Sequence, residues 1–302
     1  MDKRITVTYG ENARQMTRDV LESVQLERMI PKGASIGIKP NLVVAKPASS
    51  GATTSPVMAE ALIEYLQQHG HRNLMILEGS WVGDSTRRAF KVCGYEEISE
   101  RYGVPLFDAK HDAYTVKTYD GISMEISDRA LSMDFLINMP VLKGHCQTRV
   151  TGALKNMKGC ISDREKRRFH TLGLHKPIAY LNKILCPDFI LADGLCGDLD
   201  FEEGGNPVLM DSYMASAMGY RPADIEYIRI AADIGVGSCD IDHAEIVALN
   251  RDPTKARPAL SRKVQKLECY AAPRDACSAC YANLIRALAR LDEEVPQHLA
   301  EK

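Results

Sequence analysis

Short apolar runs alternate with amphipathic segments along the first half of the chain. The runs predict strands, each bounded by turn-forming residues, over Ile5–Tyr9, Ser35–Val43, Asn73–Glu78, Pro105–Asp108 and Phe135–Met139. Apolar positions at helical spacing between them predict helices over Ala13–Arg28, Val57–His69 and Thr86–Cys93. This alternation favours an α/β fold, in which a mostly parallel sheet is flanked by helices.

The pattern continues in the second half with fewer strands. We expect a strand at Phe189–Ala192, helices at Val208–Met218 and Ala223–Ile234, and a last strand at Glu245–Leu249. Between them, Asp198–Gly205 is rich in acids and glycine. Its carboxylates lack the spacing of a calcium-binding loop, so we expect a solvated loop there.

Residues 251–262 are rich in proline and arginine, which predicts a linker. We therefore expect an α/β body over residues 1–258, with a break near residue 140 that would divide it into two lobes. Residues 259–302 would form the end of the linker and a helical tail that contains cysteines.

Composition and net charge indicate which classes of function the chain favours. The chain has 302 residues, 38 Lys or Arg and 40 Asp or Glu, and a net charge of −2, which gives no general affinity for nucleic acid or membranes. No apolar run approaches the ~20 residues that span a bilayer, and no signal peptide is apparent, so we expect a cytoplasmic protein. Nine cysteines in a reducing compartment favour metal or redox chemistry over disulfides.

Polar residues follow several of the predicted strands. They are Lys39, Asn41, Glu78 and Asp193. Because ligands of such sheets bind beyond the carboxyl ends of the strands, these residues are candidates for ligand binding in one shared cleft. Ordinary turn formation is the alternative explanation for their positions.

The segment from Lys143 to Lys176 concentrates basic residues and histidines. Its candidate residues are His145, Lys155, Lys158, Arg164 and His170. A predicted loop-to-helix step at residues 151–153 would offer backbone N–H groups that, with Lys155 and Lys158, hold a phosphate or carboxylate. His145 is a candidate acid or base and Lys155 a candidate electrostatic stabiliser. The basic run 164–168 is equally typical of a solvated helix face.

Cysteines mark the tail. Cys277 and Cys280 stand in a C-x2-C arrangement near a predicted helix start, and Cys269 lies eight residues upstream. Three ligands are one fewer than a 4Fe–4S cluster requires. Cys196 is a candidate fourth, with Cys160, Cys146, a water or a substrate as alternatives. Zinc, a redox dithiol and buried packing thiols remain alternatives.

Several segments together resemble the family called domain of unknown function 362. They are Lys39–Leu42, Thr53–Pro56, Glu78–Ser80, Lys143–Gly159, Ala192–Gly194, Asn206–Asp211 and Met218–Tyr220. Some members of that family carry ferredoxin-type iron–sulfur segments. This chain lacks their compact cysteine run, so the resemblance does not imply a standard ferredoxin module.

The basic segment is also similar, more distantly, to the lactate racemase family. In that family a lysine ten residues after a histidine carries a nickel-pincer cofactor, and a later histidine helps to bind nickel. Here His145 and Lys155 have that spacing, and His170 follows. The chain departs from the pattern at Ala153 and at Lys158-Gly159, and it lacks that family's histidine-rich motif in the first domain, so common architecture is what the similarity implies.

Our leading hypothesis is an iron–sulfur or metal-binding protein with a basic cleft for a small anionic ligand, a carboxylate or phosphate. The sequence names no reaction. A second hypothesis is a non-catalytic electron carrier or cluster-assembly protein with a redox protein partner. A third is a nucleic-acid-binding module that uses residues 164–168, which we rank last because few aromatic residues accompany the basic run.

Overall fold

A computed structural model describes residues 4–145, 147–195, 201–204 and 206–250. The predicted cysteine tail therefore lies outside the described residues, as does Cys196. All statements below concern the described part of the chain.

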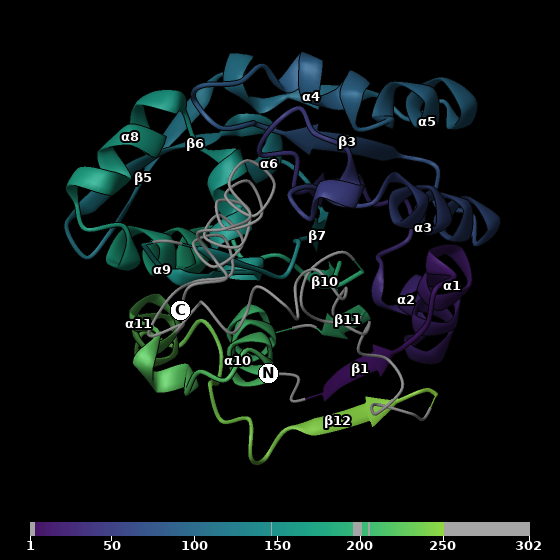
Figure 1. Ribbon diagram of the computed structural model, residues 1–302. Coiled ribbons are helices and arrows are strands. Elements are labelled where there is room, and N and C mark those ends of the chain that lie inside the picture. Colours follow the sequence, from purple (N-terminus) through teal and green to yellow (C-terminus); the bar gives the residue numbers. More distant parts are fainter. Residues whose placement is uncertain (1–3, 146, 196–200, 205, 251–302) are drawn as a thin grey trace, which may run out of the picture.

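The centre of the fold is a sheet of eight described strands in the order β12-β1-β11-β10-β7-β2-β3-β4 (Figure 1). The strands are β1 (Arg4–Thr8), β2 (Ile36–Pro40), β3 (Leu74–Glu78), β4 (Leu106–Asp108), β7 (Phe135–Met139), β10 (Phe189–Ala192), β11 (Phe201–Gly204) and β12 (Glu245–Ala248). From β4 to β10 every neighbouring pair is parallel. This confirms the predicted α/β class. The sheet includes strands from both sides of residue 140.

Strand β11 corrects the prediction of a solvated loop at Asp198–Gly205 for Phe201–Gly204, the part of that segment that the structure describes. It pairs antiparallel with β1 on one side and with β10 on the other, so that Glu202 lies opposite both Val7 and Ala192. Acidic residues and glycine disfavour strands in isolation. Here two neighbouring strands offer backbone hydrogen-bonding partners on both sides, and this tertiary context outweighs the local preference.

Helices cover both faces of the sheet. One set forms a core cluster with β2, β3 and β7 and consists of α1 (Ala13–Val24), α2 (Leu26–Met29), α3 (Pro56–Gln68), α4 (Thr86–Val92) and α5 (Tyr95–Tyr102). The other set packs with β1 and β10 and consists of α6 (Asp128–Leu131), α7 (Ala153–Asn156), α8 (Asp163–Thr171), α9 (His175–Ile184), α10 (Pro207–Ala217) and α11 (Glu226–Asp233). The predicted helix Ala13–Arg28 is two helices, because Gln25 adopts a left-handed conformation with φ 53°.

Strand β7 shows how the two cores are separated. Phe135, Ile137 and Met139 belong to the core with the first set of helices, whereas Leu136 belongs to the other core. This is the period-two alternation of a strand buried on both faces. Asn138 shares the side of Leu136, and its amide donates to the carbonyl oxygen of Ala153 at the start of α7.

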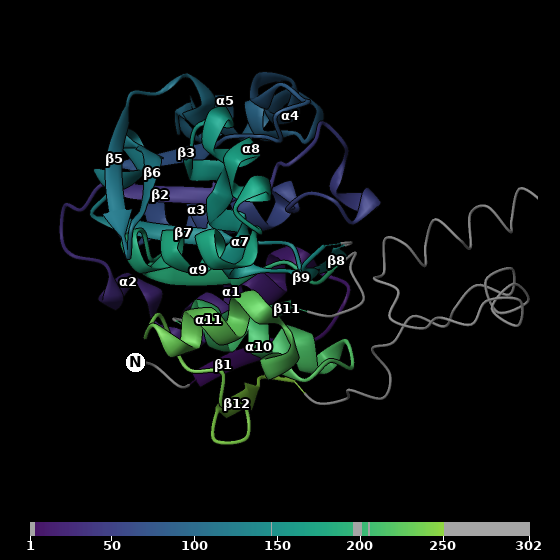
Figure 2. The ribbon, with the colours of Figure 1, turned by 90° about the vertical axis from the view of Figure 1, so that its left-hand side faces the viewer.

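Two hairpins extend the fold and were not predicted. The first joins β5 (Tyr114–Tyr119) to β6 (Ile122–Ser127), and the second joins β8 (Lys143–His145) to β9 (Arg149–Thr151). Figure 2 shows β3, β2 and β7 one above the other, with the β5–β6 hairpin along one edge and α8 beside it. Short 3₁₀ turns complete the fold at η1 (Ala48–Ser50), η2 (Ala109–His111), η3 (Met157–Cys160) and η4 (Pro222–Asp224).

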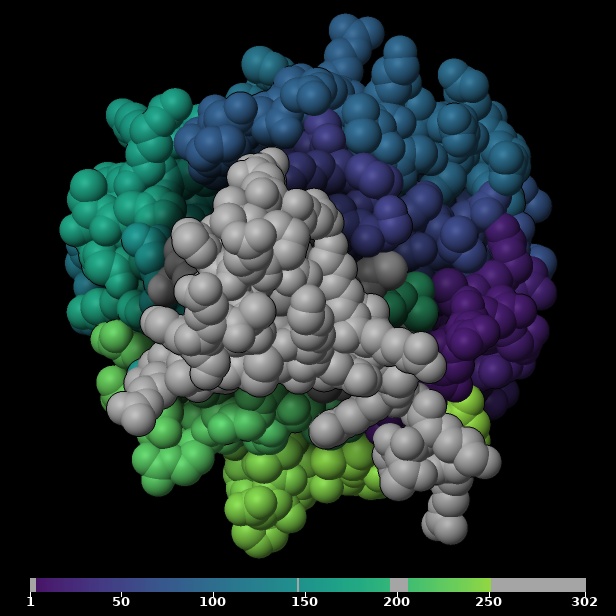
Figure 3. Space-filling model, viewed as in Figure 1, coloured from purple at the N-terminus to yellow at the C-terminus, as the bar shows by residue number. Residues whose placement is uncertain are grey.

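The space-filling view shows the arrangement of the chain from outside. The first hundred residues, in purple and blue, form the top and right of the molecule, and residues after 205, in green and yellow, form the bottom (Figure 3). Of the helices described, none has the length and apolarity needed to cross a bilayer.

Candidate functional site

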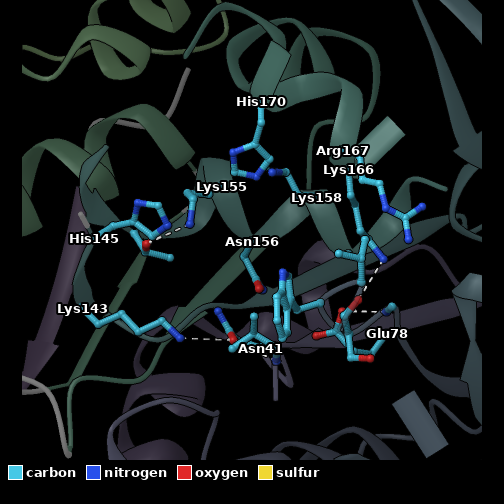
Figure 4. A pocket seen from close by; sticks show the side chains of 17 residues that line it. Asn41, Glu78, Lys143, His145, Lys155, Asn156, Lys158, Lys166, Arg167 and His170 are labelled. Carbon is cyan, nitrogen blue, oxygen red and sulfur yellow. Dashed lines mark hydrogen bonds between the residues drawn. The ribbon is translucent and has the colours of Figure 1, made fainter. Parts of the chain in front are cut away.

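A pocket of about 400 Å³ lies beyond the carboxyl ends of β2 and β3 (Figure 4). Chain segments that follow these strands form one side, with Asn41 after β2 and residues 78–82 at the end of β3. The β8–β9 hairpin, α7, η3 and α8 form the rest. We call it the basic pocket. Its lining residues are Asn41, Val43, Glu78, Gly79, Ser80, Trp81, Val82, Lys143, His145, Thr151, Lys155, Asn156, Lys158, Gly159, Lys166, Arg167 and His170.

Positive charge dominates the lining. Of the described residues that form it, five are lysine or arginine and one is a carboxylate, Glu78. Two histidines, His145 and His170, lie among the lysines (Figure 4). Glu78 is paired with Lys39 outside the lining, and Lys166 is paired with Asp163, also outside it. The remaining lysines and Arg167 still give the lining an excess of positive charge.

Glu78 forms a buried ion pair with Lys39. The ammonium Nζ of Lys39 lies 2.8 Å from Oε1 of Glu78, and both side chains are almost completely removed from solvent. The carboxylate also accepts the backbone N–H groups of Leu42 and Gly79, each at 2.7 Å. The pair thus ties the end of β2 to the end of β3 and fixes one wall of the pocket.

Two glycines let the chain come close to this ion pair. A Cβ atom on Gly159 would lie 2.1 Å from Oε1 of Glu78, and one on Gly79 would lie 2.5 Å from the carbonyl oxygen of Gly159. Any side chain at either position would push η3 away from the end of β3. The close approach brings Lys158, the neighbour of Gly159, to the pocket.

Helix α7 is held in place by buried amides. Asn156 donates to Oδ1 of Asn138 at 2.7 Å and to the carbonyl oxygen of Lys39 at 3.3 Å. Because Asn138 is also bonded to Ala153, both ends of this one-turn helix are anchored to the sheet. Lys155 on the same helix is thereby oriented towards the pocket.

The start of α7 corrects one prediction. We expected its N–H groups to bind an external anion, but the carboxylate of Asp211 on α10 accepts those of Ala153 at 2.5 Å and Leu154 at 3.1 Å. Complete burial raises the pKa of Asp211 to about 7, although these hydrogen bonds favour its charged form. The side chains of the segment, rather than its backbone, therefore face the ligand space.

Lys155 and Lys158 point into the pocket from α7 and η3 (Figure 4). Nζ of Lys155 donates to the hydroxyl of Thr151 at 3.3 Å. Nζ of Lys158 lies 5.7 Å from the centre of the Phe169 ring. Burial, and to a smaller extent the charge of Lys166, lower the pKa of Lys158 to about 8.

Lys143 and Lys166 occupy opposite sides of the pocket. Nζ of Lys143 donates to the carbonyl oxygen of Ala52 at 2.6 Å, and burial lowers its pKa to about 8. Nζ of Lys166 donates to the carbonyl oxygen of Ser80 at 3.0 Å and to the carboxylate of Asp163 at 3.1 Å. Both ammonium groups thus have defined acceptors in the protein.

His145 is held as a neutral ring. Its Nδ1 accepts the backbone N–H groups of Gln147 at 3.1 Å and Thr148 at 3.2 Å, so the proton of the neutral imidazole lies on Nε2. Burial, followed by the charges of Lys155 and Lys158, lowers its pKa to about 3. Burial and the same two lysines also lower the pKa of His170. Neutral His145 is therefore a hydrogen-bond donor in the pocket.

Some of the candidate residues predicted from the sequence line the pocket, and the others lie outside its lining. His145, Lys155, Asn41, Glu78, Lys158 and His170 line the pocket. Lys39 lies behind the wall as the partner of Glu78. Arg164 is exposed and pairs with Glu125, away from the pocket, and Asp193 is buried and accepts the N–H of Ser55 at 2.7 Å. Arg164 and Asp193 are therefore not part of the lining.

Sequence reasoning missed several lining residues. They are Lys143, Lys166, Arg167 and Trp81. Lys166 and Arg167 belong to the basic run, and helical spacing alone did not show which of its side chains turn inward. Trp81 follows the predicted strand Asn73–Glu78 and lies two residues after Gly79. This position near the carboxyl end of a strand was the available indication that it lines the pocket.

The described residues contain no group of three His, Cys, Asp or Glu side chains suited to a metal ion. The donor set of the basic pocket does not fit a bare divalent cation such as nickel, because lysines surround both histidines and Nδ1 of His145 is occupied. The cysteine ligands predicted for a cluster, Cys269, Cys277, Cys280 and Cys196, lie outside the described residues.

The model of one protein family matches residues 36–219, which span β2 to the C-terminal end of α10 and include the whole basic pocket. The chain belongs to the family described as domain of unknown function (DUF362). This confirms the resemblance inferred from the sequence. The DUF362 region thus contains both the buried ion pair and every residue that lines the pocket.

One relative is the thylakoid-associated protein of Synechocystis sp. (strain ATCC 27184 / PCC 6803 / Kazusa), with 23% identity over 199 residues. The match covers 64% of this chain and 60% of that relative. Two solved structures are also similar. The lactate racemase apoprotein from Thermoanaerobacterium thermosaccharolyticum has a TM-score of 0.43 and 16% identity, over 62% of this chain and 50% of the other. A Thermotoga maritima protein from a structural genomics consortium has a TM-score of 0.48 and 12% identity, over 74% and 60%.

Proposed function

We propose that this DUF362 protein binds a small carboxylate or phosphate in the basic pocket. The observation that carries the proposal is the charge imbalance of the lining. Five lysine or arginine residues face one carboxylate, which is already paired with Lys39. Buried charges are costly unless they are paired, so a pocket of this kind is stabilised when an anion enters it.

Two residues have properties suited to chemistry on the bound anion. His145 can donate from Nε2 to a ligand oxygen while it remains neutral, which supports charge that develops on that oxygen. Lys155 lies beside it and supplies positive charge (Figure 4). The sequence suggested His145 as an acid or base. Its low pKa favours a donor role instead, because a group that stays neutral at pH 7 is a weak base.

Isothermal titration calorimetry with inorganic phosphate and with glutarate tests the proposal. A charged hydrogen bond contributes about 1.5–3 kcal/mol, so Lys155→Met should weaken binding by about 10-fold to 100-fold. Lys117→Met is the matched control, since Lys117 is exposed on β5 and outside the pocket. A dissociation constant that is equal in the wild type and in Lys155→Met, or no binding to the wild type, would refute the proposal.

The iron–sulfur hypothesis has a separate basis. It rests on the cysteines of the tail and Cys196, which the described residues do not include, and so it stays a prediction from the sequence, as do zinc and a redox partner. The cytoplasmic location is likewise a prediction from the sequence.

The basic run 164–168 does not form one surface. Arg164 pairs with Glu125, Lys166 is buried, Arg167 lines the pocket and Arg168 pairs with Glu165. Nucleic-acid binding usually requires basic side chains gathered on one face, and this arrangement does not favour it.

A further inference from the structure

Lys158 differs from the other lysines around the basic pocket. Lys143 donates to Ala52, Lys155 to Thr151 and Lys166 to Ser80. Within the described residues, the amine of Lys158 has an aromatic ring as its neighbour and neither a hydrogen-bond acceptor nor a carboxylate partner. In the part of the chain that the structure describes, its nitrogen therefore has no hydrogen-bonding or ionic partner.

The surroundings of Lys158 favour the uncharged amine. The ring of Phe169 is fully buried beneath it, and neighbouring Lys166 repels a second positive charge. Desolvation and a nearby cation are the two features by which proteins convert lysine into a nucleophile. With a pKa of about 8, about half of Lys158 is deprotonated at pH 8.

We propose that Lys158 forms an imine with the carbonyl carbon of a 2-oxo carboxylate held in the basic pocket. This rests on the proposed function, because the carboxylate group of the ligand is what the other cations would bind. The uncharged amine attacks the carbonyl carbon and gives a carbinolamine. The carbonyl oxygen then leaves as water with the two amine hydrogens, and a carbon–nitrogen double bond remains.

The neighbouring groups fit the needs of this step. Nε2 of His145 is available to donate to the carbonyl oxygen as negative charge develops on it. His170 lies next to Lys158 (Figure 4). A neutral imidazole has one nitrogen that donates and one that accepts, so it can relay a proton between nitrogen and oxygen. A cavity of about 400 Å³ has room for a small 2-oxo acid.

Reductive trapping tests the proposal. The full chain is incubated at pH 8 with 2-oxoglutarate and sodium cyanoborohydride, whose hydride reduces an imine to a stable secondary amine. Peptide mass spectrometry then locates the label on the wild-type protein, so the result does not depend on a variant that folds. Lys158→Arg keeps the charge but cannot form the imine, and Lys117→Arg is the matched control.

We expect the label on Lys158, with labelling at least tenfold lower in Lys158→Arg, unchanged in Lys117→Arg, and suppressed by excess glutarate, which has the same carboxylates and no carbonyl. Label that is spread over exposed lysines and persists in Lys158→Arg would overturn the assignment. If glutarate binds in the calorimeter and no label forms, the imine is wrong and the anion pocket stands. If neither ligand binds, the proposed function and the imine both fail.

Discussion

Glu78→Gln removes the negative partner of a lysine that has no access to solvent. Lys39 would then be a buried charge without a carboxylate, because its remaining contact is the carbonyl oxygen of Pro40 at 2.7 Å. Breaking a buried ion pair in this way costs about 3–5 kcal/mol. For a chain of this size each kcal/mol lowers Tm by about 2–4 °C, so we expect a fall of roughly 6–20 °C.

The matched comparison is the double variant Lys39→Met, Glu78→Gln, which removes both charges. It should regain about 2 kcal/mol of the loss and stay about 1–3 kcal/mol below the wild type. Glutamine can accept with one oxygen, whereas the carboxylate accepts the N–H groups of both Leu42 and Gly79. Urea unfolding of the wild type, both single variants and the double variant gives the coupling energy. Additive losses in the double variant would refute the claim that the two charges stabilise each other.

Three further predictions concern Lys158, Gly159 and the cysteines of the tail. Lys158→Met should raise the free energy of unfolding by about 1–3 kcal/mol at pH 7, because the pKa of Lys158 in the folded state, about 8, lies below its ordinary 10.5. The unfolded chain binds the extra proton between these values, so this gain should fade as pH rises from 8 to 10.5, and a pH-independent gain in urea unfolding would contradict it. Gly159→Ala should destabilise the protein by about 1–3 kcal/mol, because the added Cβ would overpack against Glu78. The loss is measured as a fall in Tm, and an unchanged Tm would show that η3 can move aside. Protein purified without oxygen should contain iron and sulfide that are lost in Cys277→Ala, Cys280→Ala, and metal analysis that finds neither in the wild type would end the cluster hypothesis.

Most of the sheet could be predicted from apolar runs. Strands β3, β7 and β10 are buried on both faces and stand out as short hydrophobic segments between turn residues. Strand β5 (Tyr114–Tyr119) is half-exposed or exposed and largely polar, so its sequence resembles a loop. Strand β11 has acids and glycine and exists because two strands flank it.

The general position of the site and several of its residues could be predicted from the sequence. Strand ends and the basic segment indicated Glu78, His145, Lys155 and Lys158, because polar residues after buried strands gather at one edge of a parallel sheet. What the sequence could not show was the partner of each charge. Arg164 has the same chemistry as its neighbours in the basic run, but Glu125 from the β5–β6 hairpin holds it outside the pocket.

Because the sequence does not show long-range partners, the prediction of an external anion at the start of α7 was also wrong. The Thr151-Gly152-Ala153 step does present N–H groups, as predicted, but the carboxylate that binds them belongs to Asp211, far along the chain. Gly152 is necessary for this contact, since a Cβ atom there would lie 2.1 Å from Oδ1 of Asp211. Long-range pairing of this kind leaves no local pattern in the sequence.

The most direct test of an anion site in the basic pocket uses its own tryptophan. Trp81 is the single tryptophan of the chain and lines the pocket, so its fluorescence reports on ligands that bind there. Titration with glutarate should give a saturable change at low salt that weakens as salt is added, and Lys155→Met should shift the midpoint at least tenfold. A flat signal in the wild type, or a midpoint that Lys155→Met leaves unchanged, would contradict an anion site at this position.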